Sequence, residues 1–236
     1  MNEIIKVNKI YPAYMGEVNK FGIGHPCTFL RLAGCNLRCY YETFGTLCDT
    51  PEALGSSFCK ELTIYAILKQ LEELGNDLVC VTGGEPLMQE HSYDLLKALS
   101  AYKYDVVVET NGSCEISHAI PNVSYVVDYK LRSTGVTEMM LEKNWERMTE
   151  DDYLKFVIYD WADFEEMLKW VNDNYCFKGK ISAGLFWGSH LSYVDFSKRL
   201  KRELPQAILN MQTHKMEVLY DHYKAVVQNI FIPKDL

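Results

Sequence analysis

The hydrophobic pattern between residues 63 and 75 predicts an amphipathic helix. Apolar side chains recur there three or four positions apart, at Ile64, Ile67, Leu68, Leu71 and Leu74. This spacing places them along one face of an α-helix. Thr63 carries a hydroxyl group that can cap the first turn, and Gly75 is the residue type that most often ends a helix. We therefore expect a helix over residues 63–75 with one buried face.

From this helix onward, short apolar runs typical of strands alternate with helical segments. The expected strands cover residues 78–81, 105–110, 124–128, 154–159, 180–186 and 207–211. Further helices are expected near residues 93–99, 161–171 and 191–204. Continuous apolar strands separated by helices indicate a parallel sheet covered by helices. About six such strands are too few for an eight-stranded barrel. We expect an α/β fold, an incomplete (βα) barrel, with a doubly wound open sheet as the alternative.

Composition restricts the class of protein. Of 236 residues, 48% are apolar and 24% are charged, which is typical of a globular chain, and we expect one domain over residues 1–236. The formal net charge of −8 disfavours nonspecific binding to nucleic acid. No apolar run reaches the roughly 18 residues of a membrane span, and residues 1–6 lack the basic-then-apolar order of a signal peptide. We expect a cytoplasmic protein without nucleic-acid or membrane partners.

Polar residues follow the expected strands at the end where functional groups gather in parallel α/β folds. These strand-end groups are Gly83-Gly84-Glu85, Glu109-Thr110-Asn111, Asp128-Tyr129-Lys130 and Gln212-Thr213-His214. Since the carboxyl ends of parallel strands meet at one edge, the pattern predicts that these groups share a site.

Three cysteines near the N-terminus, Cys35, Cys39 and Cys48, are candidate metal ligands. Thiolates suit zinc and iron–sulfur clusters. A structural zinc site needs four ligands, and Cys59 or His25 is available as the fourth. A [4Fe–4S] cube held by three cysteines instead leaves one iron open for chemistry. On spacing alone, both interpretations stay open.

The motifs Gly34–Cys39, Cys48–Thr50 and Gly83–Pro86 resemble those of the radical S-adenosylmethionine (SAM) superfamily. In finer detail the chain resembles its 7-carboxy-7-deazaguanine synthase family. The segments that match this family are Gly16-Glu17, Phe29–Gly34, Val81–Leu87, Glu109–Gly112, Asp128–Leu131 with Ser133, Lys155–Ile158 and Gln212–Lys215. The cysteine motif alone matches only the superfamily, whereas the combination is far more specific.

The chain departs from the family pattern at two places. The family's third cysteine usually comes three residues after the second, where this chain has Glu42. Because Cys48-Asp49-Thr50 restores the family phrase, we interpret residues 41–47 as an insertion within a cluster loop over 35–48. The family also commonly has Gln before the N-terminal Gly-Glu pair, where this chain has Met15.

The resemblance implies a [4Fe–4S] cluster, SAM and Mg²⁺ as cofactors. Cys35, Cys39 and Cys48 would ligate three irons, and Thr50 would bind Mg²⁺. The fourth iron would chelate SAM, and an electron from the cluster would cleave SAM to a 5′-deoxyadenosyl radical. The residues implied for SAM binding are Leu47, Asp49, Gly83, Gly84, Glu85, Asn111 and Ser133. Gly83 and Gly84 are expected to let the backbone approach the methionine moiety closely.

The implied substrate is 6-carboxy-5,6,7,8-tetrahydropterin, converted by ring contraction and loss of ammonia. Residues implied to contact it are Tyr14, Met15, Gly16, Glu17, Arg31, Thr82 and His214. Arg31 offers a carboxylate two parallel N–H donors, which lysine cannot reproduce. Glu17 can accept hydrogen bonds from the pterin edge. The resemblance also implies a flavodoxin or ferredoxin type reductant and a homodimer.

Several alternatives compete with this interpretation. The chain can instead be another radical SAM enzyme, such as an activase that installs a glycyl radical, or a zinc-stapled binding protein without catalysis. Arg31 can pair with a surface acid, and Glu85 can simply hold its turn. Glu109 and Asp128 can be structural hydrogen-bond acceptors. The acidic stretch 138–152 is expected to be a solvated face.

Overall fold

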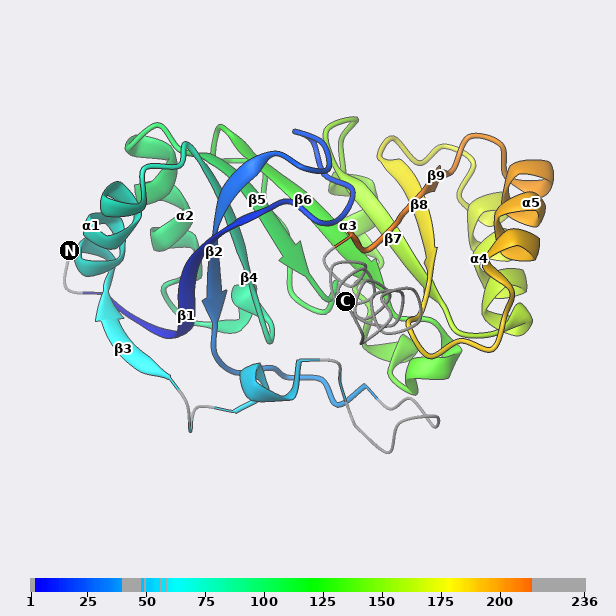
Figure 1. Ribbon diagram of the computed structural model, residues 1–236, viewed down its shortest axis with the longest axis horizontal. Coiled ribbons are helices and arrows are strands. Elements are labelled where there is room, and N and C mark those ends of the chain that lie inside the picture. Colours follow the sequence, from blue (N-terminus) through cyan, green and yellow to red (C-terminus); the bar gives the residue numbers. More distant parts are fainter. Residues whose placement is uncertain (1–2, 40–47, 49, 56, 58, 214–236) are drawn as a thin grey trace, which may run out of the picture.

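The computed structural model describes residues 3–39, 48, 50–55, 57 and 59–213 (Figure 1). The described strands are β1 (Ile4–Tyr14), β2 (Pro26–Leu32), β3 (Lys60–Thr63), β4 (Leu78–Gly83), β5 (Asp105–Thr110), β6 (Val123–Tyr129), β7 (Tyr153–Ile158), β8 (Lys180–Leu185) and β9 (Ile208–Leu209). The described α-helices are α1 (Ile64–Leu74), α2 (Ser92–Ala101), α3 (Lys143–Arg147), α4 (Trp161–Asp173) and α5 (Tyr193–Glu203).

These strands form one sheet in the order β3-β1-β2-β4-β5-β6-β7-β8-β9. The strands from β2 and β4 through β9 run parallel, whereas β1 pairs antiparallel with β2 and β3. The six predicted strands are confirmed as β4 to β9, although β9 has only two residues. The hydrophobic pattern did not predict β1, β2 and β3.

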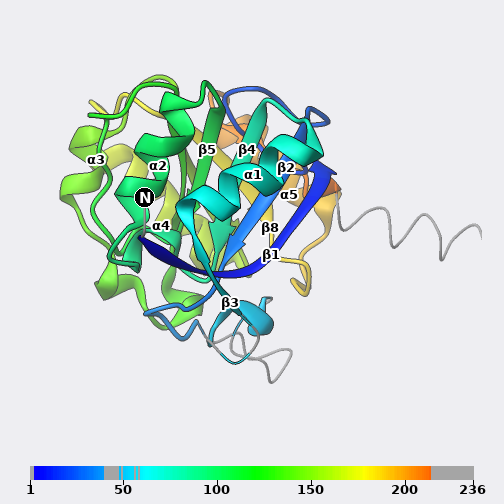
Figure 2. The ribbon, with the colours of Figure 1, turned by 90° about the vertical axis from the view of Figure 1, so that its left-hand side faces the viewer.

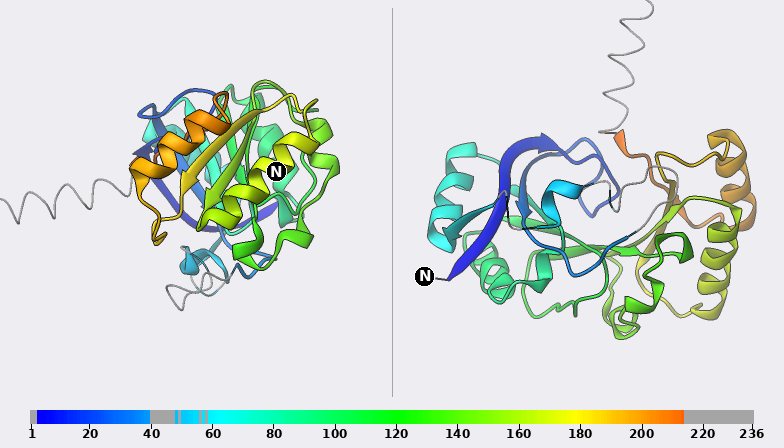
Figure 3. Two further views of the ribbon diagram at one scale, coloured as in Figure 1. Left: turned by 90° about the vertical axis from the view of Figure 1, so that its right-hand side faces the viewer. Right: turned by 90° about the horizontal axis from the view of Figure 1, so that it is seen from below.

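The helices cover one side of a curved sheet, which confirms the incomplete barrel over the doubly wound alternative. In Figure 2, α1 and α2 lie side by side on the outside of the strands. Seen from below in Figure 3, α1, α2, α4 and α5 follow the outer side of the curve. The 3-10 helix Pro51–Ala53 lies beneath the carboxyl ends of the strands in Figure 1 and in front of the interior of the curve when seen from below in Figure 3.

Helix α1 begins and ends where its sequence signals predict. The Thr63 hydroxyl accepts a hydrogen bond from the Ala66 N–H at 3.2 Å. Gly75 adopts a left-handed conformation at φ 70°, and its N–H donates to the Leu71 carbonyl. Between these caps, Ile64, Ile67, Leu68 and Leu71 are buried. Each such apolar side chain contributes about 1.5–3 kcal/mol of burial free energy.

The two faces of the parallel strands pack against different partners. Side chains such as Val79, Val81, Val106 and Val108 belong to the large core beneath the helices. The alternate positions face the barrel interior. A second apolar cluster fills this interior toward the amino ends of the strands. This interior cluster contains Met15, Val18, Cys27, Leu78, Cys80, Val107, Val126 and Tyr153.

The turn between β1 and β2 meets the chain that follows β9, although the two segments lie near opposite ends of the sequence. Val18 N–H donates to Asn210 Oδ1 at 3.0 Å, and Thr213 N–H donates to the Gly16 carbonyl at 2.9 Å. The sheet therefore curves far enough for segments near its two edges to come into contact here. This contact closes the barrel over its interior at one point.

The acidic stretch 138–152 differs from its prediction. The stretch 138–152 is not simply a solvated face, because Asp152 is fully buried and accepts the Tyr125 N–H at 2.7 Å. Trp145 and Met148 of the same stretch pack into the main core. None of the helices in the described part of the chain has the length and apolarity that a bilayer crossing requires.

Candidate active site

A cavity of about 390 Å³ opens at the carboxyl ends of the parallel strands. This volume falls within the roughly 300–1,000 Å³ typical of small-molecule sites. The strand residues that line the cavity lie two positions further along the chain than residues of the apolar interior cluster. Thr82 stands two residues beyond Cys80, and Glu109 stands two residues beyond Val107. Because side chains alternate along a strand, these polar groups point into the same interior as the apolar ones.

The cysteine segment is attached to the glycine turn by backbone hydrogen bonds. Gly34 N–H donates to the Ala53 carbonyl at 2.8 Å, and Glu85 N–H donates to the Gly34 carbonyl at 2.8 Å. A Cβ atom at Gly84 would lie 2.1 Å from the Gly34 oxygen, and one at Gly83 would lie 2.1 Å from the Leu32 oxygen. These glycines therefore permit contact between two backbone segments of the protein itself.

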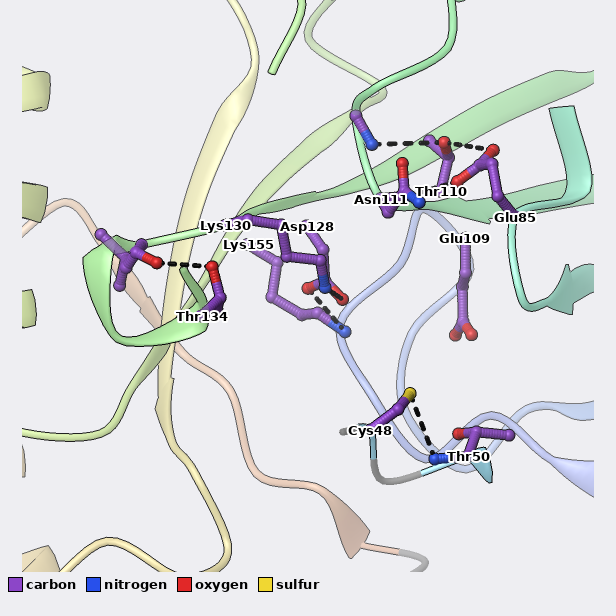
Figure 4. A network of polar contacts seen from close by, with 12 residues as sticks. Cys48, Thr50, Glu85, Glu109, Thr110, Asn111, Asp128, Lys130, Thr134 and Lys155 are labelled. Atoms are coloured by element: carbon purple, nitrogen blue, oxygen red, sulfur yellow. Dashed lines mark hydrogen bonds and ion pairs between the residues drawn. The ribbon is translucent and has the colours of Figure 1, made fainter. Parts of the chain in front are cut away.

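The sulfur atoms of this segment accept hydrogen bonds near the cavity. Thr50 N–H lies 3.4 Å from Cys48 Sγ, as Figure 4 shows. Leu37 N–H lies 3.4 Å from Cys35 Sγ, and Asn111 Nδ2 lies 3.6 Å from the same sulfur. Cys39 and Cys48 line the cavity. Such donors around thiol groups suit thiolate ligands, whose charge they stabilise.

Within the described ranges, no three His, Cys, Asp or Glu side chains converge closely enough to hold one metal ion. A cubane cluster has a different requirement, because each thiolate binds a separate iron and the sulfurs stand farther apart.

A buried network of charges forms another wall of the cavity (Figure 4). Lys155 Nζ lies 2.5 Å from Glu17 Oε2 and 3.2 Å from Asp128 Oδ1. Lys130 Nζ lies 3.1 Å from the other Asp128 oxygen. Asn210 and Gln212 also donate to Glu17, at 3.1 and 2.7 Å. The carboxylate of Glu17 is thus held by donors from β7 and from the chain after β9.

These contacts fix the ionisation of the network. Burial, the largest single effect, would raise the pKa of Glu17, but the charge and hydrogen bond of Lys155 together with the Gln212 hydrogen bond leave the pKa lowered. The pKa of Asp128 is lowered in the same way, against burial, by Lys130 and Lys155. Burial disfavours a charged lysine, yet Asp128, Glu17 and Glu109 raise the pKa of Lys155 well above its usual value. Glu17 and Asp128 are therefore carboxylates, and Lys155 is an ammonium ion.

Arg31 reaches the cavity from β2 and is held on two sides. Its Nη1 donates to Glu52 Oε1 at 2.8 Å, and its Nη2 donates to the Tyr11 hydroxyl at 3.3 Å. Its Nε is buried and has no hydrogen-bond partner among the described residues. The Tyr11 ring stacks on Phe29 at a centroid distance of 5.5 Å, which adds an aromatic wall beside the guanidinium group. Arg31 thus pairs with an acid, and one of its donors remains unsatisfied.

Comparison with known proteins identifies the family. No protein-family model matches the chain. It is 34% identical over 226 residues to 7-carboxy-7-deazaguanine synthase of Leptospira interrogans, covering 89% of this chain and 93% of that protein. It is 33% identical to the synthase of Clostridium acetobutylicum, covering 82% and 87% of the two chains. The chain belongs to the 7-carboxy-7-deazaguanine synthase family.

A solved structure shares the fold of this family member. The crystal structure of Streptococcus suis SuiB bound to S-adenosylmethionine superposes with a TM-score of 0.50 at 14% identity. The match covers 75% of this chain and 44% of the SuiB chain. At this level of identity, the likeness concerns the fold.

The cavity of this synthase-family chain brings together most of the residues expected at its site. The expected residues that line the cavity are Tyr14, Gly16, Glu17, Arg31, Cys39, Cys48, Thr50, Thr82, Gly83, Gly84 and Asn111. Cys35 lies beside them through its contact with Asn111. Leu47, Asp49 and His214, with the insertion 41–47, lie outside the described residues.

Three expected residues lie elsewhere. Met15 is fully buried in the interior apolar cluster, because its side chain fills the barrel beneath the cavity. Ser133, in the 3-10 helix Arg132–Thr134 after β6, donates to Oδ2 of Asp163 in the first turn of α4 at 2.6 Å, and it is not among the residues that line the cavity. Glu85 is also fully buried, and the Leu87 N–H, Thr110 hydroxyl and Asn111 N–H donate to it at 2.9, 2.8 and 2.7 Å. Its carboxylate therefore holds the turn behind the glycines.

Some cavity residues had no expected role. Lys155 was noted only as part of a family segment, although a lysine inside an apolar strand is a signal for a buried partner. Tyr11 and Phe29 come from strands that the hydrophobic pattern did not predict. Phe186 and Val157 add apolar surface to the same cavity.

Proposed function

We propose that this chain is a 7-carboxy-7-deazaguanine synthase that converts 6-carboxy-5,6,7,8-tetrahydropterin to 7-carboxy-7-deazaguanine and ammonia. The observation that carries the proposal is the identity of 34% across 93% of a relative of that name. The cavity supports it independently, because it combines an arginine, a buried carboxylate and aromatic side chains. These groups suit a flat, hydrogen-bonding acid such as a carboxypterin.

The chemistry of the donor groups fits the implied cofactors. Cys35, Cys39 and Cys48 would hold the [4Fe–4S] cluster, with the Leu37, Thr50 and Asn111 donors on their sulfurs. Gly83, Gly84 and Asn111 would contact SAM, and the Thr50 hydroxyl would bind Mg²⁺, a cation that prefers oxygen ligands. When bound, the cluster and SAM supply the electron and the carbon radical that removes hydrogen from the substrate.

The protein's own residues bind and orient the substrate. Arg31, which lines the cavity, would meet the substrate carboxylate through its terminal N–H groups, which fixes one end of the ring. Glu17 would accept from the N–H edge at the other end while Lys155 keeps it ionised. Tyr11 and Phe29 would cover a ring face and exclude water. This arrangement holds the reacting carbon in one place, which is the main contribution that a protein makes to cofactor chemistry.

We also propose that residues 1–236 form one catalytic domain, which takes electrons from a flavodoxin or ferredoxin type protein and acts as a homodimer. The substrate is a small molecule. These proposals follow from the family and from the size of the cavity.

The function is tested by direct turnover. The protein is reconstituted with iron and sulfide without oxygen, reduced, and incubated with SAM and carboxytetrahydropterin. We expect deazaguanine product by mass and one ammonia per product, both absent without SAM. SAM cleavage without this product would indicate a different radical SAM enzyme. A colourless protein with stoichiometric zinc would indicate the binding-protein alternative.

A further inference from the structure

Glu109 lines the cavity, and the substrate contacts proposed above do not use it. It stands near the end of β5, and its side chain points toward the side of the cavity formed by Cys48 and Thr50 (Figure 4). The Thr82 hydroxyl donates to its Oε2 at 2.9 Å. This hydrogen bond holds one carboxyl oxygen, the buried Cys80 thiol also bonds to the Glu109 side chain, and the carboxyl group lines the cavity.

Among the described side chains, the lysines near Glu109 are paired with other carboxylates. Lys155 pairs with Glu17 and Asp128, and Lys130 also pairs with Asp128. No ion pair joins Glu109 to a cation in the described ranges, so an ionised Glu109 would be a third carboxylate facing two lysines. The titratable groups that face it are Tyr11 on β1, Glu17 in the turn, Cys27 on β2, Cys80 on β4, Asp128 on β6 and Lys155 on β7.

The ionisation of the three described cavity carboxyl groups follows from this arrangement. Burial and the nearby Glu17 and Asp128 carboxylates raise the pKa of Glu109, against the opposing effects of Lys155 and the Thr82 hydroxyl. The pKa values of Glu17 and Asp128 are lowered instead. Of the three, Glu109 is therefore the one suited to carry a proton near neutral pH.

We propose that Glu109 is a catalytic residue that protonates the amine leaving the substrate ring. This inference rests on the function proposed above, whose reaction must release ammonia. As the carbon–nitrogen bond breaks, its electron pair goes to nitrogen, which takes the proton from the Glu109 carboxyl group. The adjacent ring carbon loses its proton to the resulting carboxylate, and the electron pair of that carbon–hydrogen bond forms the new double bond. The acid is thereby restored, and no oxidant is needed.

The surrounding residues assist this proton transfer. The Thr82 hydroxyl stabilises the carboxylate that exists between the two steps. Lys155 contributes its charge at longer range, while its contacts to Glu17 and Asp128 keep it from being a competing proton donor. Thr82 is thus a positioning residue for the catalytic carboxyl group.

The test compares wild-type protein with Glu109→Gln on carboxytetrahydropterin. Glutamine keeps the shape and accepts from Thr82, but it has no proton to give. We expect unchanged iron content and SAM binding, with ammonia and deazaguanine formation lower by about 100-fold or more. A ring-contracted species isomeric with the substrate should accumulate. Glu109→Asp should restore part of the rate, and Glu61→Gln, an exposed glutamate of β3, should behave as wild type.

A pH profile separates catalysis from a structural role. Wild-type turnover should fall as pH rises through the pKa of Glu109. This alkaline limb of the pH–rate profile should vanish in Glu109→Gln. Thr82→Val removes a donor that lowers the pKa of Glu109, so the limb should move to higher pH. If Glu109→Gln does not fold, Thr82→Val still tests the assignment. Active wild-type protein with the same limb in both variants overturns the role of Glu109 and leaves the function standing. Wild-type protein that makes no deazaguanine overturns both.

Discussion

The ammonium group of Lys155 lies 2.5 Å from the carboxylate of Glu17, although 138 residues separate them in the chain. One residue comes from the middle of β7 and the other from the turn between β1 and β2. Their pairing links the curved sheet to the turn that borders the cavity, so the substrate contact proposed for Glu17 and the closure of the barrel depend on the same ion pair.

Lys155→Met should therefore destabilise the protein. The variant leaves Glu17 and Asp128 buried without their cation, which we expect to lower the free energy of unfolding by about 3–5 kcal/mol. The matched control is Lys169→Met, which breaks only an exposed pair with Asp173 and should cost less than about 0.5 kcal/mol. Chemical denaturation measures both, and equal losses would contradict the network's importance.

The pH dependence of this difference has a defined sign. The pKa values of Glu17 and Asp128 are lowered in the folded protein. Their stabilisation is present above the usual carboxyl pKa and is lost as pH falls through the folded values. The stability advantage of wild type over Lys155→Met should thus be largest near neutral pH and shrink in acid. A constant difference across this range would argue against ionised partners.

Gly84→Ala should disturb the cysteine segment. The added Cβ would lie 2.1 Å from the Gly34 oxygen and 2.7 Å from the Ala53 oxygen, and backbone cannot yield as a flexible side chain can. We expect a loss of about 1–3 kcal/mol of stability together with lower iron content after reconstitution. Gly55→Ala is the control, because its nearest neighbours lie 4.0 Å away. Thermal melting and iron analysis distinguish the two variants.

Cys48→Ala should abolish the cluster, whereas Cys59→Ala should leave it intact. Cys48 lines the cavity with Cys39, and Cys59 does not. Iron and sulfide content after anaerobic reconstitution, with the visible absorption of the cluster, provides the measurement. Loss of the cluster in Cys59→Ala alone would mean that residues 41–47 are not a simple insertion before the third ligand.

Arg31→Lys should weaken the binding of substrate more than that of SAM. A lysine cannot present two parallel donors, and losing one charged hydrogen bond costs about 1.5–3 kcal/mol, or on the order of a 10- to 100-fold rise in KM. SAM affinity, measured by calorimetry on the same protein, serves as the internal control, and Arg202→Lys tests an exposed arginine. Equal losses for both ligands would remove Arg31 from carboxylate binding.

Local signals in the sequence were sufficient for the order and type of most elements. The caps Thr63 and Gly75 act through hydrogen bonds to neighbouring residues, so they can be recognised without knowledge of the fold. The apolar runs that became β4 to β8 are short and bounded by polar residues. The cysteines and the strand-end motifs likewise indicate the family from the sequence alone.

Tertiary structure alone decided which side chains face the cavity. Strands buried on both faces are almost uniformly apolar, so their sequence lacks the alternation that marks inside and outside. Glu85 and Glu109 illustrate this, because both follow apolar runs, yet one is sealed behind the glycine turn and the other enters the cavity. Met15 and Lys155 acquire their roles only when the sheet curls and joins distant segments. The sequence by itself thus determined the elements and the kinds of chemical group available, and the curvature of the sheet determined which of them meet.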